Sequence, residues 1–590
     1  MILFFQNPDN NLFAVSTASQ LEDDQISKLI WLFGNAEVKS DKSIDGWFIG
    51  PRKEMITPWS TNAVEITQNM GISGIVRIEG FIPIEEDASF DPMLEVKYNG
   101  LHQDIFTLHR LPEPVIDIED IADYNTKEGL ALNDNEIEYL ENLCKKIGRN
   151  LTDSEVFGFS QVNSEHCRHK IFNGTFIIDE QVQPASLFDL IRKTSTENPN
   201  RIISAYKDNV AFIKGPVAEQ FAPANQDHAD YFETRNIDTV LSLKAETHNF
   251  PTTVEPFNGA ATGSGGEIRD RMAGGTASIP LAGTAVYMTS YPRHNPVRKW
   301  ESATNSRTWL YQTPFDILIK ASNGASDFGN KFGQPLIAGS LLTFEHKGNN
   351  KIYGYDKVIM LAGGIGFGKS KDSKKKRPEP GDKIVVLGGD NYRIGMGGGA
   401  VSSVDTGEFG NAIELNAIQR SNPEMQKRVY NAIRAMSEAA ENPIVSVHDH
   451  GAGGHLNCLS ELVEETGGSI EINKLPVGDP TLSAKEIIGN ESQERMGLVI
   501  KEKDISLLKR VAEREIAPIY VVGEVTDDMM FRFEANGKNP IDLGLAYLFG
   551  SSPKTLLKDS TQPVAFEEIV YTEDQLTKYI KDVLRIEAVA

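Results

Sequence analysis

The chain is organised around the run KAETHNFPTTVEPFNGAATGSGGEIRD, residues Lys244–Asp270. The segment directly before it, DTVLSL, is apolar and β-branched, which predicts a buried strand. Five polar side chains follow where that strand should end: Lys244, Glu246, Thr247, His248 and Asn249. Such groups are costly to bury without partners, so we expect a functional site at the end of this strand.

The second half of the same run is rich in glycine. Its four glycines are Gly259, Gly263, Gly265 and Gly266. They predict a loop whose backbone N–H groups approach an anion, with a helix beginning there and adding its positive end. Glu267, Arg269 and Asp270 would then lie on the first turns of that helix. Glu246 and Asp270 would flank a phosphate cradle and hold Mg²⁺, which takes a few carboxylates together with phosphate oxygens. The alternative is a glycine-rich turn with solvated charges.

Composition places the chain among globular proteins of several domains. Its 590 residues correspond to roughly four domains. The net charge of −24 argues against a broad surface for nucleic acid or for an anionic membrane. The 3 cysteines form no CxxC pair, which fits a reducing cytoplasm. The first ten residues do not resemble a secretory signal, and no apolar run approaches the ~20 residues of a membrane span.

The N-terminal third predicts a small domain followed by a linker. Residues 1–115 alternate short strands and helices, and no catalytic constellation is visible there, so a structural or docking role is expected. Residues 116–135 are acidic and predict an irregular linker, with a helix over 135–146. Thr152 and Glu155 form a capping-box pattern, which predicts the start of another helix.

That helix leads into the cluster SEHCRHK, Ser164–Lys170. His166 and His169 are three positions apart and would share one helix face if the helix continued. An HxxH pair alone is a weak zinc signal, because a zinc site needs further ligands. Cys167 lies in a basic setting, which predicts a depressed thiol pKa. A polar surface helix is the alternative.

A phosphate-loop pattern occurs farther on. Gly363–Ser370 reads GGIGFGKS, a full match to G-x-x-x-x-G-K-[ST]. Such a loop must precede a helix, but KDSKKKRPEPGDK follows and predicts a charged loop. A P-loop NTPase or kinase using Lys369 and Ser370 therefore stays only as an alternative function.

Three further segments carry candidate ligands. The glycine-rich loop 388–400 fits a Rossmann fingerprint poorly but is credible for binding a phosphate. His448, Asp449 and His450 follow an apolar strand, and Asp449 is expected to be an oxygen ligand of Mg²⁺. The run ESQERM, Glu491–Met496, precedes another predicted strand.

Taken together, SEHCRHK, the Lys244–Asp270 run, VSVHDHGAGG (Val445–Gly454) and ESQERM resemble the large form of the phosphoribosylformylglycinamidine synthases. The resemblance extends over essentially the whole chain. It implies that ATP phosphorylates the amide oxygen of formylglycinamide ribonucleotide, and that ammonia from glutamine then displaces phosphate to give the amidine in purine biosynthesis. Mg²⁺ and ATP are the implied cofactors, and a cytoplasmic location is implied.

The resemblance also assigns roles to residues. His248 is implied as the proton acceptor and His166 as the second catalytic histidine. Metal binding is implied for Glu246, Asp270 and Asp449. ATP binding is implied for Lys244, His169, Gly259, Ala260, Ala261, Thr262, Gly263, Ser264, Gly265, Gly266, Glu267, Ile268, Arg269 and Asp270. Substrate binding is implied for Thr247, Asn249, Phe250, Arg269, Gln419, Glu491, Ser492 and Gln493. Compact family members carry tyrosine at the position of His169, which weakens that one assignment.

The implied fold is a mixed α+β and α/β chain of several domains. The expected divisions are an accessory-subunit-like domain at 1–115, a linker domain at 116–189, a barrel-forming synthetase subdomain at 190–380, an α/β subdomain at 381–550 and a tail at 551–590. The large enzyme has two synthetase units and a glutaminase domain, whereas this sequence shows one unit and no glutaminase cysteine motif. We therefore expect an N-terminal part of a longer enzyme, with ammonia supplied from elsewhere and the barrel strands paired with a second half or a second copy. A non-catalytic scaffold is the remaining alternative.

Overall fold

The computed structural model describes residues 1–90, 95–108, 110–294, 300–309, 311–348, 351–401, 419, 421–491, 494–549, 553–563, 568 and 570–585. The chain forms two compact units. The first contains residues 1–114 with 390–393 and 476–483, and the second contains the remainder. Two predicted site residues, Ser492 and Gln493, lie outside the described residues.

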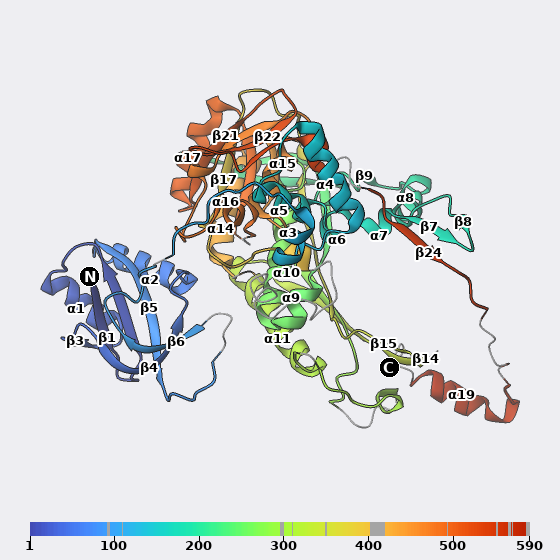
Figure 1. Ribbon diagram of the computed structural model, residues 1–590, viewed down its shortest axis with the longest axis horizontal. Helices are drawn as coiled ribbons and strands as arrows, with labels where there is room; N and C mark the ends of the chain where they lie inside the picture. Colours follow the sequence, from blue (N-terminus) through green and yellow to red (C-terminus); the bar gives the residue numbers. More distant parts are fainter. Residues whose placement is uncertain are drawn as a thin grey trace. The chain divides into compact units, whose positions relative to one another are not determined.

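The first unit is a six-stranded sheet with two helices (Figure 1, blue). The strand order is β3-β1-β2-β5-β4-β6. The elements are β1 (Ile2–Gln6), β2 (Leu12–Thr17), α1 (Asp23–Leu32), β3 (Glu37–Lys39), β4 (Ile44–Pro51), α2 (Pro58–Asn69), β5 (Ile75–Ile84) and β6 (Glu95–Leu101). Leu29 of α1 and Ala63 of α2 pack with Phe5, Val15 and Ile78 in one apolar cluster, so both helices cover the same face of the sheet.

The second unit begins with helices that make a small core of their own. They are α3 (Ile121–Glu128), α4 (Asp134–Ile147) and α5 (Asp153–Val162), followed by α6 (Glu165–Arg168), α7 (Lys170–Asn173), β7 (Thr175–Ile178), β8 (Gln181–Val182) and α8 (Leu187–Glu197). The predicted capping box is confirmed, because Thr152 Oγ1 accepts from Glu155 N and the Glu155 side chain accepts from Thr152 N. The prediction of an irregular linker over 116–135 is wrong where α3 forms.

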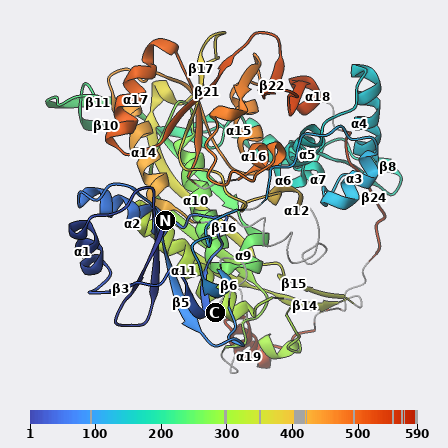
Figure 2. The same cartoon turned by 60° about the vertical axis from the view of Figure 1, so that its left-hand side comes forward.

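The next segment builds a six-stranded sheet in the order β13-β12-β16-β11-β10-β9. Its strands are β9 (Ile202–Ser204), β10 (Ala211–Pro223), β11 (Phe232–Thr247), β12 (Ile279–Thr289), β13 (Leu336–Thr343) and β16 (Ile359–Lys369). The helices of this segment are α9 (Asn249–Val254), α10 (Pro256–Met272) and α11 (Pro314–Phe332), and β14 (Glu345–Gly348) pairs with β15 (Lys351–Gly354). Residues of α10 and α11 form one core cluster with β12 and β16. Figure 2 shows α10 and α11 beside β16.

A seven-stranded sheet follows, in the order β18-β20-β17-β21-β19-β22-β23. Its strands are β17 (Lys383–Leu387), β18 (Ile444–Asp449), β19 (Gly468–Glu471), β20 (Met496–Ile500), β21 (Ile519–Val525), β22 (Met530–Glu534) and β23 (Ile541–Gly544). The accompanying helices are α12 (Gly398–Val401), α14 (Pro423–Glu438), α15 (Gly454–Leu462), α16 (Ala484–Gly489), α17 (Ile505–Arg514) and α18 (Leu545–Phe549). β24 (Leu556–Asp559) pairs with β7, and α19 (Leu576–Val583) is the last described helix.

The two sheets share a core through helices. One cluster joins α10 and α11 to α14, α17 and one face of the second sheet, while α15 and α5 cover the other face. This packing brings the end of β11, the end of α10 and the end of β18 to one place, where the candidate site lies.

Candidate active site

Strand β11 carries the predicted polar residues to the edge of its sheet. Lys244 and Glu246 are two positions apart, so they point to the same face of the strand. The Lys244 ammonium lies 3.0 Å from Glu246 Oε2 and 3.1 Å from Asp270 Oδ2, and Asp270 comes from the last turns of α10. Asp449 ends β18 and completes the group of three predicted acids. Tertiary packing therefore brings the Lys244–Asp270 run and the HDH segment together.

The charges in this group act on one another strongly. Burial raises the pKa of Asp270 to about 7, which Lys244 opposes and Asp449 and Glu246 reinforce. Burial works against the charge on Lys244, but Asp270 and Glu246 outweigh it and raise the pKa of the ammonium. Burial would also raise the pKa of Asp449, but hydrogen bonding and charge from His448, with Arg269, hold it below its usual value. Asp270 is thus the acid of the three that protonates most readily.

Sequence reasoning missed the residue that joins two of these acids. Asn209 Nδ2 donates to Asp270 Oδ1 at 3.0 Å and to Asp449 Oδ1 at 2.8 Å. It lies just before β10, 61 positions from Asp270, in a segment with no motif. Only the polar YKDN sequence around it hinted at a role.

The three acids present oxygen donors of the type that Mg²⁺ prefers. Within the ranges that the structure describes, no group of three or more His, Cys, Asp or Glu side chains is close enough to hold a metal ion. The physical reason is that the Lys244 ammonium and the Asn209 amide lie between the carboxylates. The donor set fits Mg²⁺, provided that these nitrogens move aside.

His248 follows β11 and precedes α9. Its Nδ1 is buried and has no hydrogen-bond partner within the described residues. Burial lowers the pKa of His248 to about 4. An interaction with the Gly259 backbone opposes this shift, and charge on His166 acts in the same direction as burial. The imidazole is therefore neutral near pH 7 and keeps one nitrogen that can accept a proton.

The glycine-rich part of the run is not a loop. It forms the interior of helix α10, with Gly259 and Gly263 fully buried. A Cβ at Gly259 would lie 2.4 Å from the Pro251 carbonyl carbon, and one at Gly263 would lie 3.0 Å from His248 Cβ. The predicted phosphate loop is wrong, because these glycines allow α10 to pack against α9 and β11.

Consequently Glu267, Arg269 and Asp270 lie at the end of α10 rather than on its first turns. Glu267 pairs with Arg271 inside the protein, and Arg269 is 2% exposed and lies 3.9 Å from Asp449 Oδ2. The assignment of residues 259–270 to ATP stays a prediction, and it cannot rest on a glycine loop.

The SEHCRHK segment differs from its expected geometry. Helix α6 ends at Arg168, and His169 takes a left-handed backbone with φ of 49°. His166 and His169 therefore do not share a continuous helix face. Burial is the largest cause that lowers the pKa of His169, and the charges of Glu246 and Lys244 also act on it. Burial raises the pKa of the Cys167 thiol to about 12, so the predicted depressed pKa is wrong.

Glu491 and Gln419 form a second polar group. Gln419 Nε2 donates to Glu491 Oε2 at 3.1 Å, and Gly453 N donates to Glu491 Oε1 at 3.3 Å. Gly398 and Gly399 also donate backbone hydrogen bonds to this carboxylate, whose pKa burial raises to about 7. The 388–400 loop, which sequence reasoning favoured for a phosphate, thus binds a carboxylate of its own chain.

The remaining predicted substrate residues have different surroundings. Asn249 Oδ1 accepts from Met360 N at 3.1 Å, and Phe250 is 2% exposed, so both side chains hold the local structure. Thr247 is exposed.

A buried histidine pair adjoins the site. Arg495 Nη1 lies 2.8 Å from His455 Nε2, and His455 Nδ1 lies 2.9 Å from His450 Nε2. Burial lowers the pKa of both histidines well below 6.5. His448 turns instead to Glu461, with which it forms an ion pair. The three residues HDH therefore have three different partners, which the sequence did not reveal.

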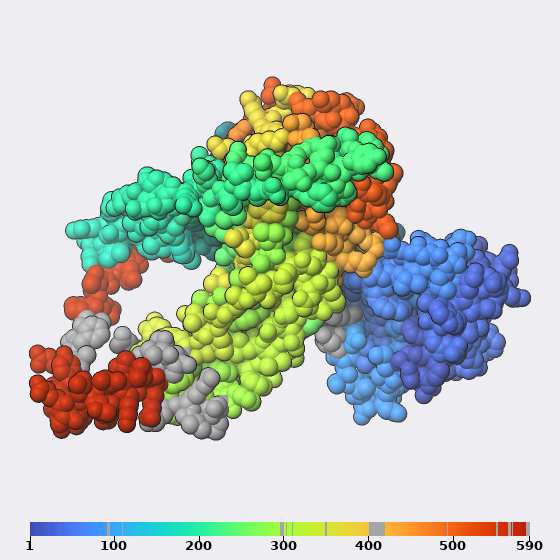
Figure 3. Space-filling view, turned by 180° about the vertical axis from the view of Figure 1, so that it is seen from behind, coloured from blue at the N-terminus to red at the C-terminus, as the bar shows by residue number. Residues whose placement is uncertain are grey.

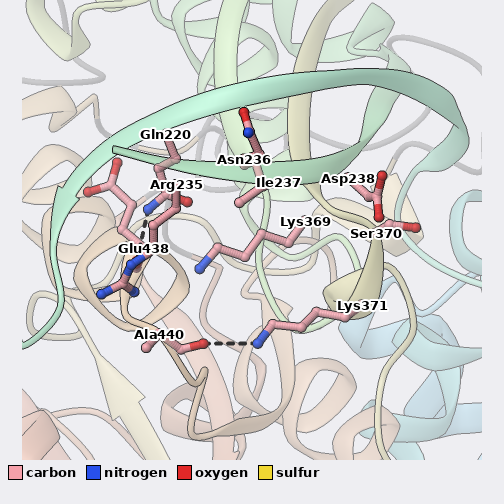
Figure 4. A pocket seen from close by; sticks show the side chains of 10 residues that line it. All are labelled: Gln220, Arg235, Asn236, Ile237, Asp238, Lys369, Ser370, Lys371, Glu438 and Ala440. Atoms are coloured by element: carbon pink, nitrogen blue, oxygen red, sulfur yellow. Dashed lines mark hydrogen bonds between the residues drawn. The ribbon is translucent and has the colours of Figure 1, made fainter. Parts of the chain in front are cut away.

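A hollow is lined by residues outside this site. A cavity of about 460 Å³ lies between the β10–β11 ribbon, the end of β16 and the end of α14 (Figure 4). Lys369 Nζ donates to Ala439 O at 2.7 Å and Lys371 Nζ to Ala440 O at 2.9 Å, so both lysines bind carbonyls that follow α14. The negative end of a helix disfavours a phosphate there.

The same geometry rules out the phosphate-loop interpretation. Gly363–Lys369 lies within strand β16, and only a three-residue 3₁₀ turn, Ser370–Asp372, follows. Gly364 and Gly366 allow close approach, since a Cβ at either would lie 2.5 Å from a carbonyl oxygen of the neighbouring β12 segment. The pattern match is accidental.

Comparison with known families gives three matches in series. Residues 10–98 match the formylglycinamide ribonucleotide amidotransferase N-terminal model, and residues 121–170 match the linker-domain model of the same family. Residues 379–535 match the C-terminal domain model of AIR synthase related proteins. In the part of the chain that the structure describes, no helix is long and apolar enough to cross a membrane.

Several solved structures are similar to this chain. T. maritima PurL complexed with FGAR is 24% identical, covers 74% of this chain and 59% of its own, and has a TM-score of 0.50. The ADP complex of that protein is 22% identical, with coverages of 76% and 61% and a TM-score of 0.49. Phosphoribosylformylglycinamidine synthase II from Thermotoga maritima is 23% identical, with coverages of 74% and 58% and a TM-score of 0.48.

The present chain thus spans about 59% of the length of the T. maritima PurL chain with which it aligns. The two amidotransferase-specific models and the synthetase-related model occur in order along it, with a fold to match. Residues 10–98 and 121–170 thus match the formylglycinamide ribonucleotide amidotransferase family, and residues 379–535 match the AIR synthase related proteins.

Proposed function

We propose that this chain carries the ATP-dependent synthetase site that converts formylglycinamide ribonucleotide to formylglycinamidine ribonucleotide. ATP phosphorylates the amide oxygen of the substrate, and ammonia then displaces phosphate to form the amidine. The observation that carries the proposal is the meeting of Lys244, Glu246, Asp270 and Asp449 beside the neutral His248, within a chain that matches this family in part. Phosphoryl transfer depends mainly on positioning and charge neutralisation, which such a group can supply.

Glu246, Asp270 and Asp449 would hold Mg²⁺, and Mg²⁺ when bound would neutralise charge on the ATP phosphates. Lys244 already bridges two of these acids, so it can turn from a carboxylate to a phosphate with a small movement. His169 lies near enough for Lys244 and Glu246 to act on its pKa, which supports its place at the ATP side.

His248 is proposed as the proton acceptor for the attacking ammonia. A pKa of about 4 keeps the imidazole neutral near pH 7, and Nδ1 has no competing partner among the described residues. His166, whose charge acts on the pKa of His248, is proposed as the second catalytic histidine. It is exposed and lies on the short helix α6.

The ribonucleotide would lie between this centre and the Glu491 group. Thr247, Arg269, Gln419 and Glu491 offer hydroxyl, guanidinium, amide and carboxyl groups toward a polar ligand. Asn249 and Phe250 support the site through packing and the bond to Met360.

A partner face is proposed on the six-stranded sheet. β13 is exposed along almost its whole length, and the open face appears at the front of Figure 3 in green and yellow-green. Strand alternation puts Leu341 on the face that packs against α10 and α11, and puts the exposed side chains of Leu243 and Leu342 on the opposite, open face. A second half of the enzyme or a second copy of this chain would cover them, since long exposed strands otherwise aggregate. Ammonia would come from glutamine in a glutaminase domain, and free cysteines together with ATP use support a cytoplasmic location.

Calorimetry with Mg-ATP and with formylglycinamide ribonucleotide tests the site in this chain. Binding of both supports the proposal, whereas binding of neither favours a scaffold. In the full-length enzyme supplied with free ammonia, His248→Ala should reduce kcat by about 10²–10⁴-fold while the substrate affinity changes little. The exposed His346→Ala is the matched control. Unchanged turnover in His248→Ala would eliminate the proton-acceptor role.

A further inference from the structure

Asn209 connects the two halves of the acid group. Its Nδ2 donates to Asp270 Oδ1 at 3.0 Å and to Asp449 Oδ1 at 2.8 Å. Asp270 comes from α10, beside the first large sheet, and Asp449 from β18 of the second. One amide therefore ties together acids that are far apart in sequence and belong to different sheets.

The orientation of this amide is fixed by its neighbours. Lys375 Nζ lies 3.3 Å from Asn209 Oδ1, and an ammonium group can only donate. The two carboxylates can only accept when ionised, so they require the NH₂ end of the amide. Lys375 is held in turn by Asp208, at 2.9 Å, and Asp208 accepts from Gly275 N at 2.7 Å. If the amide were flipped, its NH₂ group would face the Lys375 ammonium and its oxygen would face the two carboxylates, so no hydrogen bond could form.

The second carboxylate oxygen of Asp270 and that of Asp449 also lie near nitrogen atoms of the protein. Asp270 Oδ2 lies 3.1 Å from Lys244 Nζ, and Asp449 Oδ2 lies 3.9 Å from Arg269 Nε. All four oxygens thus face cationic or N–H groups of the protein itself. Two oxygens bound to one Mg²⁺ at ~2.1 Å lie about 3 Å apart, whereas the two hydrogens of one NH₂ hold their acceptors about 5 Å apart.

We propose that Asn209 is a positioning residue that holds Asp270 and Asp449 apart and competes with a divalent cation for them. Asp208 and Lys375 fix its amide in the competing orientation. The competition between Asn209 and a cation rests on the proposed function, which assigns these acids to a cation. The role of Asn209 in positioning the two acids does not rest on it. A cation that both acids share must displace the amide, so Asn209 sets how tightly the cation binds and keeps the acids in place before it arrives.

Mn²⁺ binding in the absence of nucleotide, followed by electron paramagnetic resonance, tests the competition. Asn209→Ala should tighten Mn²⁺ binding by about threefold to tenfold, because one competing hydrogen-bond donor is lost. Lys375→Met should change the affinity in the same direction by less, since the amide can then turn its oxygen to the cation. Asn225→Ala is the matched control, since Asn225 Nδ2 donates to the exposed Asp230 at 2.8 Å. Weaker Mn²⁺ binding in Asn209→Ala would make Asn209 a ligand and overturn the inference, and so would unchanged binding.

Thermal melting in EDTA tests the positioning without any metal. Asn209→Ala should melt below both the wild type and Asn225→Ala, because two buried acids lose a shared donor. Equal melting of the two variants would refute the positioning role. Failure of the proposed function has a different signature: neither the wild type nor Asn209→Ala binds Mn²⁺. That result refutes the competition, whereas the melting comparison still decides the positioning.

Discussion

Two glycines of helix α10 provide a test of how the Lys244–Asp270 run works. A Cβ at Gly259 would lie 2.4 Å from the carbonyl carbon and oxygen of Pro251, which are backbone atoms and cannot turn away. A Cβ at Gly266 would meet only Arg269 Nη2, at 3.9 Å. Both glycines lie within the same helix and neither has a positive φ, so their steric surroundings separate them.

The two alanine variants should therefore change stability in opposite directions. Gly→Ala in a helix interior gains about 0.5–1 kcal/mol from chain entropy, and Gly266→Ala should show that gain. Gly259→Ala should lower the free energy of unfolding by about 1–3 kcal/mol, because the cost of overpacking against α9 exceeds the entropic gain. Thermal melting at a fixed scan rate gives the sign for each variant, and hydrogen exchange of the α10 amides gives the local opening free energy.

A glycine loop that cradles phosphate would give a different result. In an open loop, both alanines would leave stability nearly unchanged and would weaken ATP binding together. If Gly259→Ala melts with or above Gly266→Ala, the packing of α10 against α9 is not what requires glycine at 259. ATP affinity measured on Gly266→Ala supplies the control, since the packed-helix geometry predicts no loss there.

Three further predictions follow from buried charges. Burial raises the pKa of Glu491 from its ordinary value of 4.5 to about 7, so the folded state holds the extra proton and the free energy of unfolding should fall as pH rises from 4.5 to 7, by up to about 3 kcal/mol. Glu491→Gln should lack this fall in urea unfolding measured across that range. Arg271→Met should lower the free energy of unfolding by about 3–5 kcal/mol, because Glu267 then stays buried without the guanidinium that now donates to it at 2.8 Å. Adding Glu267→Gln should recover much of this loss, and additive losses in thermal melting would contradict the pairing. Lys369→Ala should leave the affinity for Mg-ATP unchanged by calorimetry, because Lys369 binds the Ala439 carbonyl in a strand-end cavity; a tenfold loss would restore the phosphate-loop interpretation.

Local patterns predicted the framework of the site well. The apolar run before Lys244 is part of strand β11, and the alternation of that strand places Lys244 and Glu246 on one face. The capping box at Thr152 marks the start of α5, because both of its hydrogen bonds form between residues three apart. Charged loop sequence after Ser370 correctly argued against a phosphate-binding helix, since helix formation is also a local property.

The prediction of a glycine-rich loop was wrong. Gly259 and Gly263 were interpreted as loop residues because glycine disfavours helices, yet they lie inside α10. The cause is close packing against neighbours outside the helix: Pro251 faces Gly259, and His248 with Met360 faces Gly263. Glycine costs about 1 kcal/mol in a helix interior, and a clash in a close-packed contact costs more. Packing therefore outweighs helix propensity at these positions.

The prediction of a depressed thiol pKa for Cys167 was wrong for a related reason. Its basic neighbours in sequence predicted an easily ionised thiol, but burial raises the thiol pKa to about 12. Desolvation depends on what covers a side chain, and no sequence window reports that.

The sequence by itself determined the elements and the chemical types at the site. Motif residues such as His248 and Asp270 could be identified because strand alternation, helix capping and carboxylate chemistry act over a few positions. Only the tertiary structure decided which of them meet. It joined Asp270 to Asp449 through Asn209, which is 61 positions from the first and 240 from the second, and it made the glycines of α10 a packing surface, because burial, desolvation and hydrogen bonding depend on which neighbours the fold brings together.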